Sequence, residues 1–125
     1  MGAPVNPLAW AGVAVLGGLG AMTRFMVDRA VSHRLAGAFP SGILAVNLSG
    51  AFLLGLLGGL GPGTTTALLL GVGFIGSYTT FSTWMLQTLE LGEGRRFGLA
   101  VANIVVSLLL GLAVAALGWW LGNQF

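Results

Sequence analysis

The chain has 125 residues, of which 56% are hydrophobic and only 6% carry a charged side chain. A soluble domain has about 25% charged residues, so this composition excludes a water-soluble globule. Five arginines, no lysine and three acids give a net charge of +2, and without a basic stripe the sequence has no footprint for nucleic acid. The absence of cysteine excludes disulfides, thiolate catalysis and cysteine metal sites.

The charged residues fall in two clusters, at 24–34 and 90–96. The uncharged stretches before and after the clusters are each long enough for one membrane-spanning helix of about 20 residues, and the stretch 35–89 is long enough for two. We therefore predict an all-α membrane protein in which residues 1–125 form a single four-helix transmembrane domain. The spans are expected at about 8–24, 41–60, 65–89 and 97–121.

Proline and glycine mark the predicted connections. Pro7 suits the first turn of the first helix, Pro40 precedes the second span, and Gly61-Pro62-Gly63 separates the second span from the third. The segments 25–39 and 90–96 are the other two connections. Small residues spaced by four allow helices to approach closely in lipid, and they form these rows: Ala51, Gly55 and Gly59; Ala14 and Gly18; Gly94, Gly98 and Ala102.

The middle of the third span is unusually polar. Six of the seven residues from Ser77 to Thr83 carry a hydroxyl, and three glycines precede them within 71–76. Glycine and β-branched threonine both weaken a helix, so we predict a break at mid-membrane near 76–80. Carbonyls freed at such a break are natural cation ligands. In the alternative, each hydroxyl bonds the carbonyl four residues back and only bends the helix.

Three further polar residues lie within the predicted spans. Asn47 is in the second span, where an amide is costly unless it is paired. Asn103 and Ser107 are four residues apart in the fourth span and share a helical face, so they form a candidate polar track. For all three residues, a structural hydrogen bond between helices is the alternative to a role in transport.

Two aromatic residues and one arginine complete the candidate site. Phe81 and Trp84 are three residues apart, and ring edges carry a partial positive charge that would favour an anion. Packing against lipid or another helix is the alternative for both rings. Arg24 ends the first span, where it either snorkels to the interface or acts as a vestibule charge that attracts anions.

Three motifs carry a resemblance to a known family. They are Gly-Gly-Leu-Gly-Ala-Met-Thr-Arg-Phe at 17–25, Val-Asn-Leu-Ser-Gly at 46–50 and Gly-Ser-Tyr-Thr-Thr-Phe-Ser-Thr at 76–83. Together they closely resemble the CrcB/Fluc fluoride channels, and the likeness extends over nearly the whole chain. The resemblance implies a multi-pass protein of the plasma (inner) membrane that exports fluoride passively and lowers cytoplasmic fluoride. It also implies an antiparallel, dual-topology homodimer with a structural sodium ion at the dimer interface.

The resemblance also assigns roles by motif position. Gly76 and Thr79 would coordinate the sodium ion through their backbone carbonyls, Asn47 would donate to fluoride, Phe81 would offer its ring edge, and Ser107 would belong to a polar track in the fourth span. We add Trp84, Thr83 and Asn103 to the expected fluoride pathway and expect Arg24 to act as the vestibule charge. At three positions the chain departs from the family pattern: Trp84 replaces a phenylalanine, Ile43 a threonine, and Asn103 the tyrosine of some members.

The arginines raise a question of orientation. All five flank the membrane side that holds 25–40 and 90–96, so the positive-inside rule would place both termini of a single subunit outside. An antiparallel homodimer requires both orientations. On the resemblance, we expect the homodimer rather than a pair with an oppositely inserted partner.

The main alternative function is a small multidrug-type, proton-coupled exporter. Such a protein needs a carboxylate within a span, whereas the acids here lie near the predicted connections. A structural membrane subunit is a further alternative, but it would not explain the polar break. We expect no enzyme, because His33, the only histidine, lies in a connection and the sequence shows no nucleophile–base pair.

Overall fold

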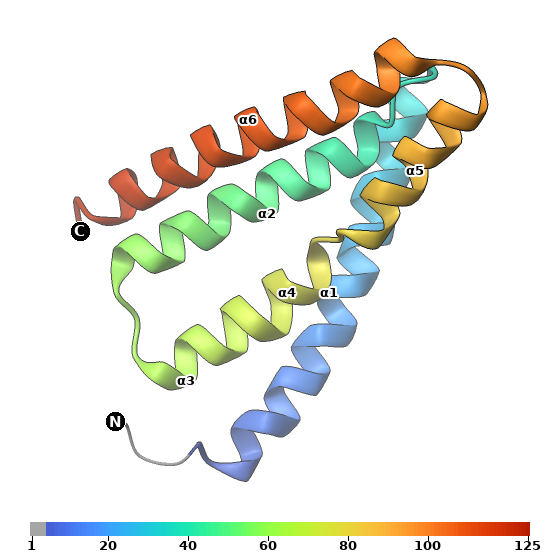
Figure 1. The fold of residues 1–125 in the computed structure, drawn as a ribbon. Coiled ribbons are helices and arrows are strands. Elements are labelled where there is room, and N and C mark those ends of the chain that lie inside the picture. The colour runs from blue at the N-terminus through green and yellow to red at the C-terminus, as the bar shows by residue number, and fades with distance from the viewer. Residues whose placement is uncertain (1–4) are drawn as a thin grey trace.

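The computed structural model describes residues 5–125 as a set of helices with short connections (Figure 1). The helices are α1 (Pro7–Arg34), α2 (Ser41–Leu60), α3 (Thr64–Thr66), the π-helix η1 (Ala67–Ile75), α4 (Gly76–Tyr78), α5 (Ser82–Glu93) and α6 (Phe97–Gly122). Three helices within residues 5–125, namely α1, α2 and α6, are long and apolar enough to cross a membrane. The chain is therefore an all-α, multi-pass membrane protein.

The predicted third span, 65–89, does not form one continuous helix. α3, η1 and α4 follow one another without a gap from Thr64 to Tyr78, and α5 begins at Ser82. Between them Thr79 adopts an extended conformation, with φ −80° and ψ 160°. The interruption at 79–81 thus lies at the edge of the predicted segment 76–80.

Helix α1 is longer than the sequence suggested. It begins at Pro7, where the Asn6 side chain accepts a hydrogen bond from the Leu8 N–H, and it continues to Arg34. The prediction of a connection over 25–39 was wrong for its first ten residues, 25–34. A charged cluster often marks the end of a membrane span, but arginine is a good helix former and no glycine or proline interrupts this segment.

Helices α2 and α6 lie side by side and run in parallel (Figure 1), with glycines at their closest approach. A Cβ atom at Gly55 would meet the Ala115 carbonyl, and one at Gly118 would meet the Phe52 carbonyl. Gly59 is similarly packed against Trp119, which confirms tight packing for Gly55 and Gly59 of the predicted row, whereas Ala51 lines a cavity. In contrast, a Cβ at Gly18 or Gly98 would meet no atom within 4 Å, so those two positions are not at helix crossings within this chain.

A second close crossing places α1 against the stretch from η1 to α4. A Cβ atom at Gly20 would meet the Phe74 carbonyl, and one at Gly17 would lie 3.1 Å from the Ser77 hydroxyl oxygen. Because Arg24 lies one helical turn after Gly20, this crossing brings its side chain beside the interruption at 79–81.

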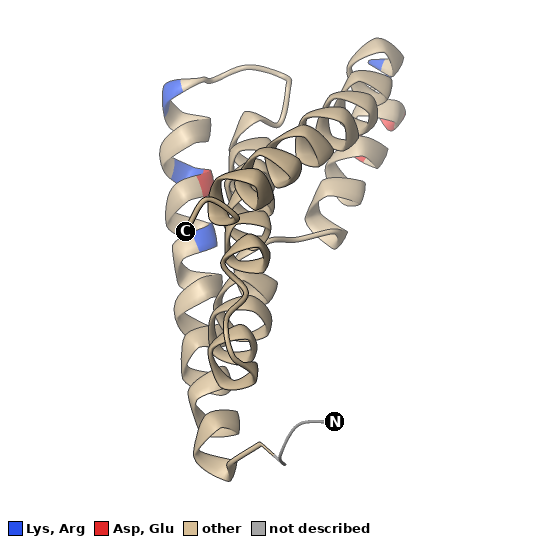
Figure 2. Ribbon diagram, turned by 90° about the vertical axis from the view of Figure 1, so that its left-hand side faces the viewer, with Lys and Arg blue, Asp and Glu red and all other residues tan. Residues whose placement is uncertain are grey.

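The two ends of the molecule differ in charge. The C-terminus and the turn at 61–63 lie at one end, while the connections 35–40 and 94–96 lie at the other (Figure 1). Charged residues lie in the half of the molecule away from the start of α1 (Figure 2). This arrangement agrees with the one-sided distribution of arginine in the sequence.

Candidate functional site

The interruption between α4 and α5 is held by an amide from another helix. The Asn47 Nδ2 in α2 donates to the Thr80 carbonyl at 2.9 Å, and the Thr80 N–H donates to Asn47 Oδ1 at 2.9 Å. The Asn47 carboxamide therefore pairs with both polar groups of one residue's backbone. One of the two Nδ2 hydrogens remains free, because only one is used for Thr80.

The Gly76 and Thr79 carbonyls, which are the predicted sodium ligands, have different partners. The Thr80 N–H would continue the helix by bonding the Gly76 carbonyl, but it donates to Asn47 instead. The Thr79 carbonyl accepts from Arg24 Nη1 at 3.5 Å. Of the two carbonyls predicted to bind sodium, that of Gly76 has lost its helical donor. That of Thr79 already accepts from the Arg24 guanidinium. Carbonyl oxygens of this kind suit a hard cation.

The hydroxyls around the interruption are mostly paired within the chain. Thr79 Oγ1 donates to the Ile75 carbonyl at 3.0 Å, and the Tyr78 and Ser49 hydroxyls lie 2.8 Å apart. Thr80, which is 8% exposed, accepts from the Thr83 N–H at 3.2 Å through its hydroxyl and donates to Thr83 Oγ1 at 3.2 Å. Thr80 therefore satisfies one of the free N–H groups in the first turn of α5.

A cavity of about 300 Å³ lies beside the interruption. Its lining comes from α2, η1, α5 and the interruption itself: Asn47, Gly50, Ala51, Leu54, Ile75, Thr79, Thr80, Phe81 and Trp84. The Phe81 ring is 71% exposed and meets the Trp84 ring edge-to-face, with centroids 5.7 Å apart and planes at 81°. The structure thus brings Asn47, Thr79, Phe81 and Trp84 together around one small space.

Asn103 and Trp84 belong to a second polar cluster, between α5 and α6. The Trp84 indole N–H donates to the Asn103 carbonyl at 3.1 Å, and Asn103 Nδ2 donates to Thr88 Oγ1 at 2.9 Å. The Thr88 hydroxyl in turn donates to the Trp84 carbonyl at 2.9 Å. Asn103 is only 1% exposed. Its amide connects the two helices, as the structural alternative predicted.

The remaining predicted residues are distributed over the surroundings. Gly76 lines a different cavity, of about 810 Å³, together with Ser77 and residues of α2. Ser107 has a buried hydroxyl oxygen without a hydrogen-bond partner among residues 5–125. Thr88 is a member of the second polar cluster and was not predicted from the sequence. Its position four residues after Trp84, on the same helical face, was the signal that could have linked it to this cluster.

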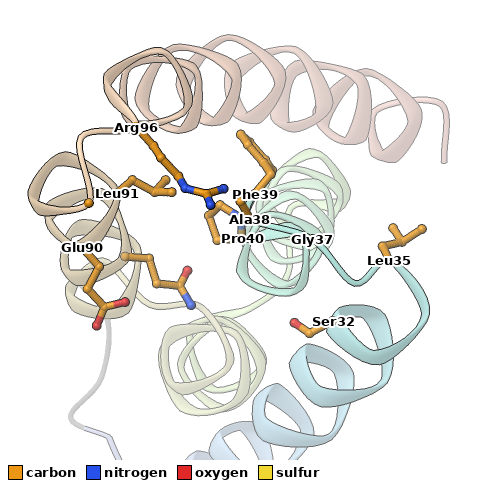
Figure 3. Close-up of a pocket in the computed structure, with 11 residues that line it drawn as sticks. Ser32, Leu35, Gly37, Ala38, Phe39, Pro40, Glu90, Leu91 and Arg96 are labelled. Atoms are coloured by element: carbon orange, nitrogen blue, oxygen red, sulfur yellow. The ribbon is translucent and has the colours of Figure 1, made fainter.

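The charged end of the molecule holds another cavity, of about 540 Å³, between 35–40, the end of α5 and the connection 94–96. The Arg96 side chain reaches over it toward Phe39 and Pro40, whereas the Glu90 carboxylate points away (Figure 3). Gln87 also lines this space, and its buried Oε1 has no partner within the described chain. An arginine is thus the charged group that faces this cavity.

Metal binding by side chains has little support in this fold. Residues 5–125 contain no group of three or more histidine, cysteine, aspartate or glutamate side chains that could hold a metal ion. Any cation at the interruption would therefore depend on backbone carbonyls and hydroxyls.

Comparison with known proteins identifies close relatives over nearly the full length. Residues 11–119 match the family described as CrcB-like protein, Camphor Resistance (CrcB). The chain is 58% identical over 114 residues to the "Fluoride-specific ion channel FluC 2" of Mycobacterium tuberculosis strain H37Rv, covering 91% of this chain and 90% of that protein. It is 47% identical over 118 residues to FluC 2 of Moorella thermoacetica, which covers 90% of this chain and 94% of the relative.

Proposed function

The chain belongs to the CrcB-like family, and we propose that it is a fluoride-selective channel through which fluoride leaves the cytoplasm passively. The observation that carries this function is the cavity in which an asparagine amide and two aromatic rings meet beside an interrupted helix. The close relatives named as fluoride-specific channels support the same ion. We further propose that the protein lies in the plasma (inner) membrane.

The groups around the cavity suit a small, strongly hydrated anion. Such an ion gives up water only for close donors, but its binding must stay weak enough for the ion to leave. Asn47 retains one free N–H, and the exposed Phe81 ring can offer its edge. Both groups are neutral, so they attract an anion without the deep trap that a fixed positive charge would create.

Proton-coupled drug export has no corresponding support. That mechanism needs a carboxylate inside a span, and the acids of this chain are Asp28, Glu90 and Glu93. Glu90 and Glu93 lie at the end of α5 next to the connection 94–96, and Asp28 lies in the last two turns of α1. The region around the interruption is built from amides, hydroxyls, rings and backbone, and its charged group is the Arg24 guanidinium rather than a carboxylate.

An antiparallel homodimer would complete the site. The Phe81 side chain is 71% exposed in the single chain and lies at the open side of the cavity that also contains Asn47. A second copy would cover this ring and close the open side of the cavity, and closed two-fold pairs are the commonest assemblies. This proposal requires insertion in both orientations, despite the clustering of arginine at one end.

A sodium ion at the interface of that dimer is the proposed cofactor. The Gly76 and Thr79 carbonyls would hold it: the first has lost its helical donor, and the second would exchange its long, 3.5 Å contact with Arg24 for the ion. When bound, the ion would fix the interrupted helices of the two subunits together and add a positive potential for anions.

Fluoride transport can be tested directly with purified protein in liposomes. We expect rapid fluoride efflux, followed with a fluoride electrode, once a potassium ionophore compensates the charge. Chloride-loaded liposomes serve as the selectivity control and should release little chloride. Absence of fluoride efflux, together with proton-coupled uptake of a lipophilic cation, would reject the channel in favour of the exporter.

The sodium site predicts a cation-specific effect on stability. Replacing Na⁺ by N-methylglucamine should lower the unfolding midpoint of the dimer, because a ligand at about 100 times its Kd contributes about 2.7 kcal/mol. Thr79→Ala retains the carbonyl and should keep most of this response. Equal midpoints in the two cations would argue against the site, whatever the flux.

A further inference from the structure

Ser107 is a helical hydroxyl that is both buried and unpaired. Its Oγ has no hydrogen-bond partner among residues 5–125. Several hydroxyls inside helices instead bond the carbonyl four residues back, at 2.7 Å for both Thr23 and Ser49 and at 2.9 Å for Thr88. This back-bonding is the ordinary arrangement for serine and threonine in a helix, so its absence at Ser107 requires a cause.

The cause lies in the carbonyl that Ser107 would use. Four residues before Ser107 is Asn103, whose carbonyl already accepts the backbone N–H of Ser107 within α6. The same carbonyl also accepts the Trp84 indole N–H at 3.1 Å. Because a carbonyl oxygen has two lone pairs, both are occupied. The indole therefore takes the acceptor that the Ser107 hydroxyl would otherwise occupy.

Trp84 is itself held in this position. The Asn103 amide donates to Thr88, and the Thr88 hydroxyl donates to the Trp84 carbonyl. These bonds, with the bond from Trp84 to Asn103, form a closed set between α5 and α6. The indole is thus fixed against α6, and its N–H is not available to an ion.

The free hydroxyl lies level with the candidate site. In the parallel pair α2 and α6, Gly55 packs against Ala115. Counting back eight residues on each helix (55 to 47 and 115 to 107) places Ser107 at the height of Asn47. Asn47 is the residue whose amide holds the interruption. A spare hydroxyl donor is therefore present at the depth at which the anion would lose its water.

We propose that Trp84 is a positioning residue of the fluoride path: by occupying the Asn103 carbonyl it prevents Ser107 from bonding its own helix and leaves that hydroxyl free to donate to fluoride. This inference rests on the proposed channel function. It assigns the indole a role through Ser107 rather than through direct contact of its N–H with the ion.

A double-mutant cycle tests the coupling. Ser107→Ala and Trp84→Phe should each lower fluoride flux about tenfold, which corresponds to losing one hydrogen bond to a charged group. The double variant should be no slower than either single variant, because the two substitutions remove the same donor. If the double variant loses flux about a hundredfold, which is the product of the two single effects, the proposal is overturned. An unchanged flux in Ser107→Ala would also overturn it.

Two further variants separate positioning from packing. Trp119→Phe makes the same exchange on α6 away from Asn103 and should leave flux unchanged. Thr88→Val removes a bond that holds Trp84, so it should lower flux, and its combination with Ser107→Ala should be no slower than Ser107→Ala alone. If Trp84→Phe does not fold, 3-benzothienylalanine at position 84 keeps the ring shape without the N–H. It should reproduce the loss of flux, and full flux with this residue would overturn the proposal. A wild-type protein without fluoride flux would refute the channel function itself, which is a distinct outcome.

Discussion

Asn47→Asp is expected to reduce fluoride flux by at least about a hundredfold. The substitution exchanges the Nδ2 donor for a charged oxygen, which would face the Thr80 carbonyl at the position of the present 2.9 Å hydrogen bond. It also places a negative charge in the proposed path. Two like charges about 4 Å apart repel by about 4 kcal/mol at an effective dielectric constant of about 20. Since about 1.4 kcal/mol corresponds to tenfold in rate, even half of this repulsion exceeds a tenfold loss.

Asn47→Ala separates the two causes, because it removes the pairing with Thr80 without adding a charge. We expect it to conduct less than wild type but more than Asn47→Asp. Ser49→Ala is the matched control. Ser49 lies on the same helix as Asn47, and its substitution breaks a contact with Tyr78 but should retain most of the flux. All three variants are compared in the liposome assay, with gel filtration to show that they fold. If Asn47→Asp conducts at the wild-type rate, Asn47 is not in the path.

The interruption of the third span illustrates how far sequence reasoning reaches. Glycine and hydroxyl content locates the weak point of the helix near 76–80, and in the structure the helix ends at Tyr78 and resumes at Ser82. The residue that stabilises the interruption is Asn47, on a different helix. Local composition indicates where a helix is weak, but the partner of the freed backbone depends on how α2 packs. The sequence alone left Asn47 with two alternatives for this reason.

Asn103 shows where prediction from residue spacing stops. Its spacing from Ser107 predicted a shared face and a polar track, and the two do lie on α6 four residues apart. In the structure the Asn103 amide is turned to Thr88 and its carbonyl to Trp84. Spacing along one helix fixes which residues share a face, but it does not show which neighbour that face meets. The end of α1 was misplaced for a related reason, since charge alone does not terminate a helix.

The glycine spacing in the sequence predicts that α2 packs closely against another helix. It does not identify that helix or the residues that α2 meets on it. Gly55 and Gly59 were expected to lie at a helix crossing, and their partners proved to be the backbone of α6 around Ala115 and Trp119. The reciprocal glycines on α6, Gly118 and Gly122, were not singled out, although they are also spaced by four. Two matching rows on neighbouring spans were the signal that would have identified this pair.

Gly118→Val is therefore expected to destabilise the fold strongly. A Cβ atom at this position would collide with the Phe52 carbonyl and would lie 2.9 Å from the Leu56 nitrogen. Both are helix backbone atoms that cannot turn aside as a side chain would. Overpacking of a close-packed contact costs about 1–3 kcal/mol, occasionally more, and here α2 and α6 must move apart along their length. We expect a loss of at least about 3 kcal/mol in the free energy of unfolding.

Gly111→Val on the same helix is the matched control, because a Cβ there would meet no atom within 4 Å. Unfolding in SDS, followed by far-ultraviolet circular dichroism, should give a much lower midpoint for Gly118→Val, whereas Gly111→Val should unfold close to wild type. Equal midpoints for the two variants would show that the contact between α2 and α6 is not as close as the structure indicates. Because the same contact sets the register between Asn47 and Ser107, a folded Gly118→Val protein should also lose fluoride flux. Loss of flux without loss of stability would show that this register, rather than the strength of packing, is what transport requires.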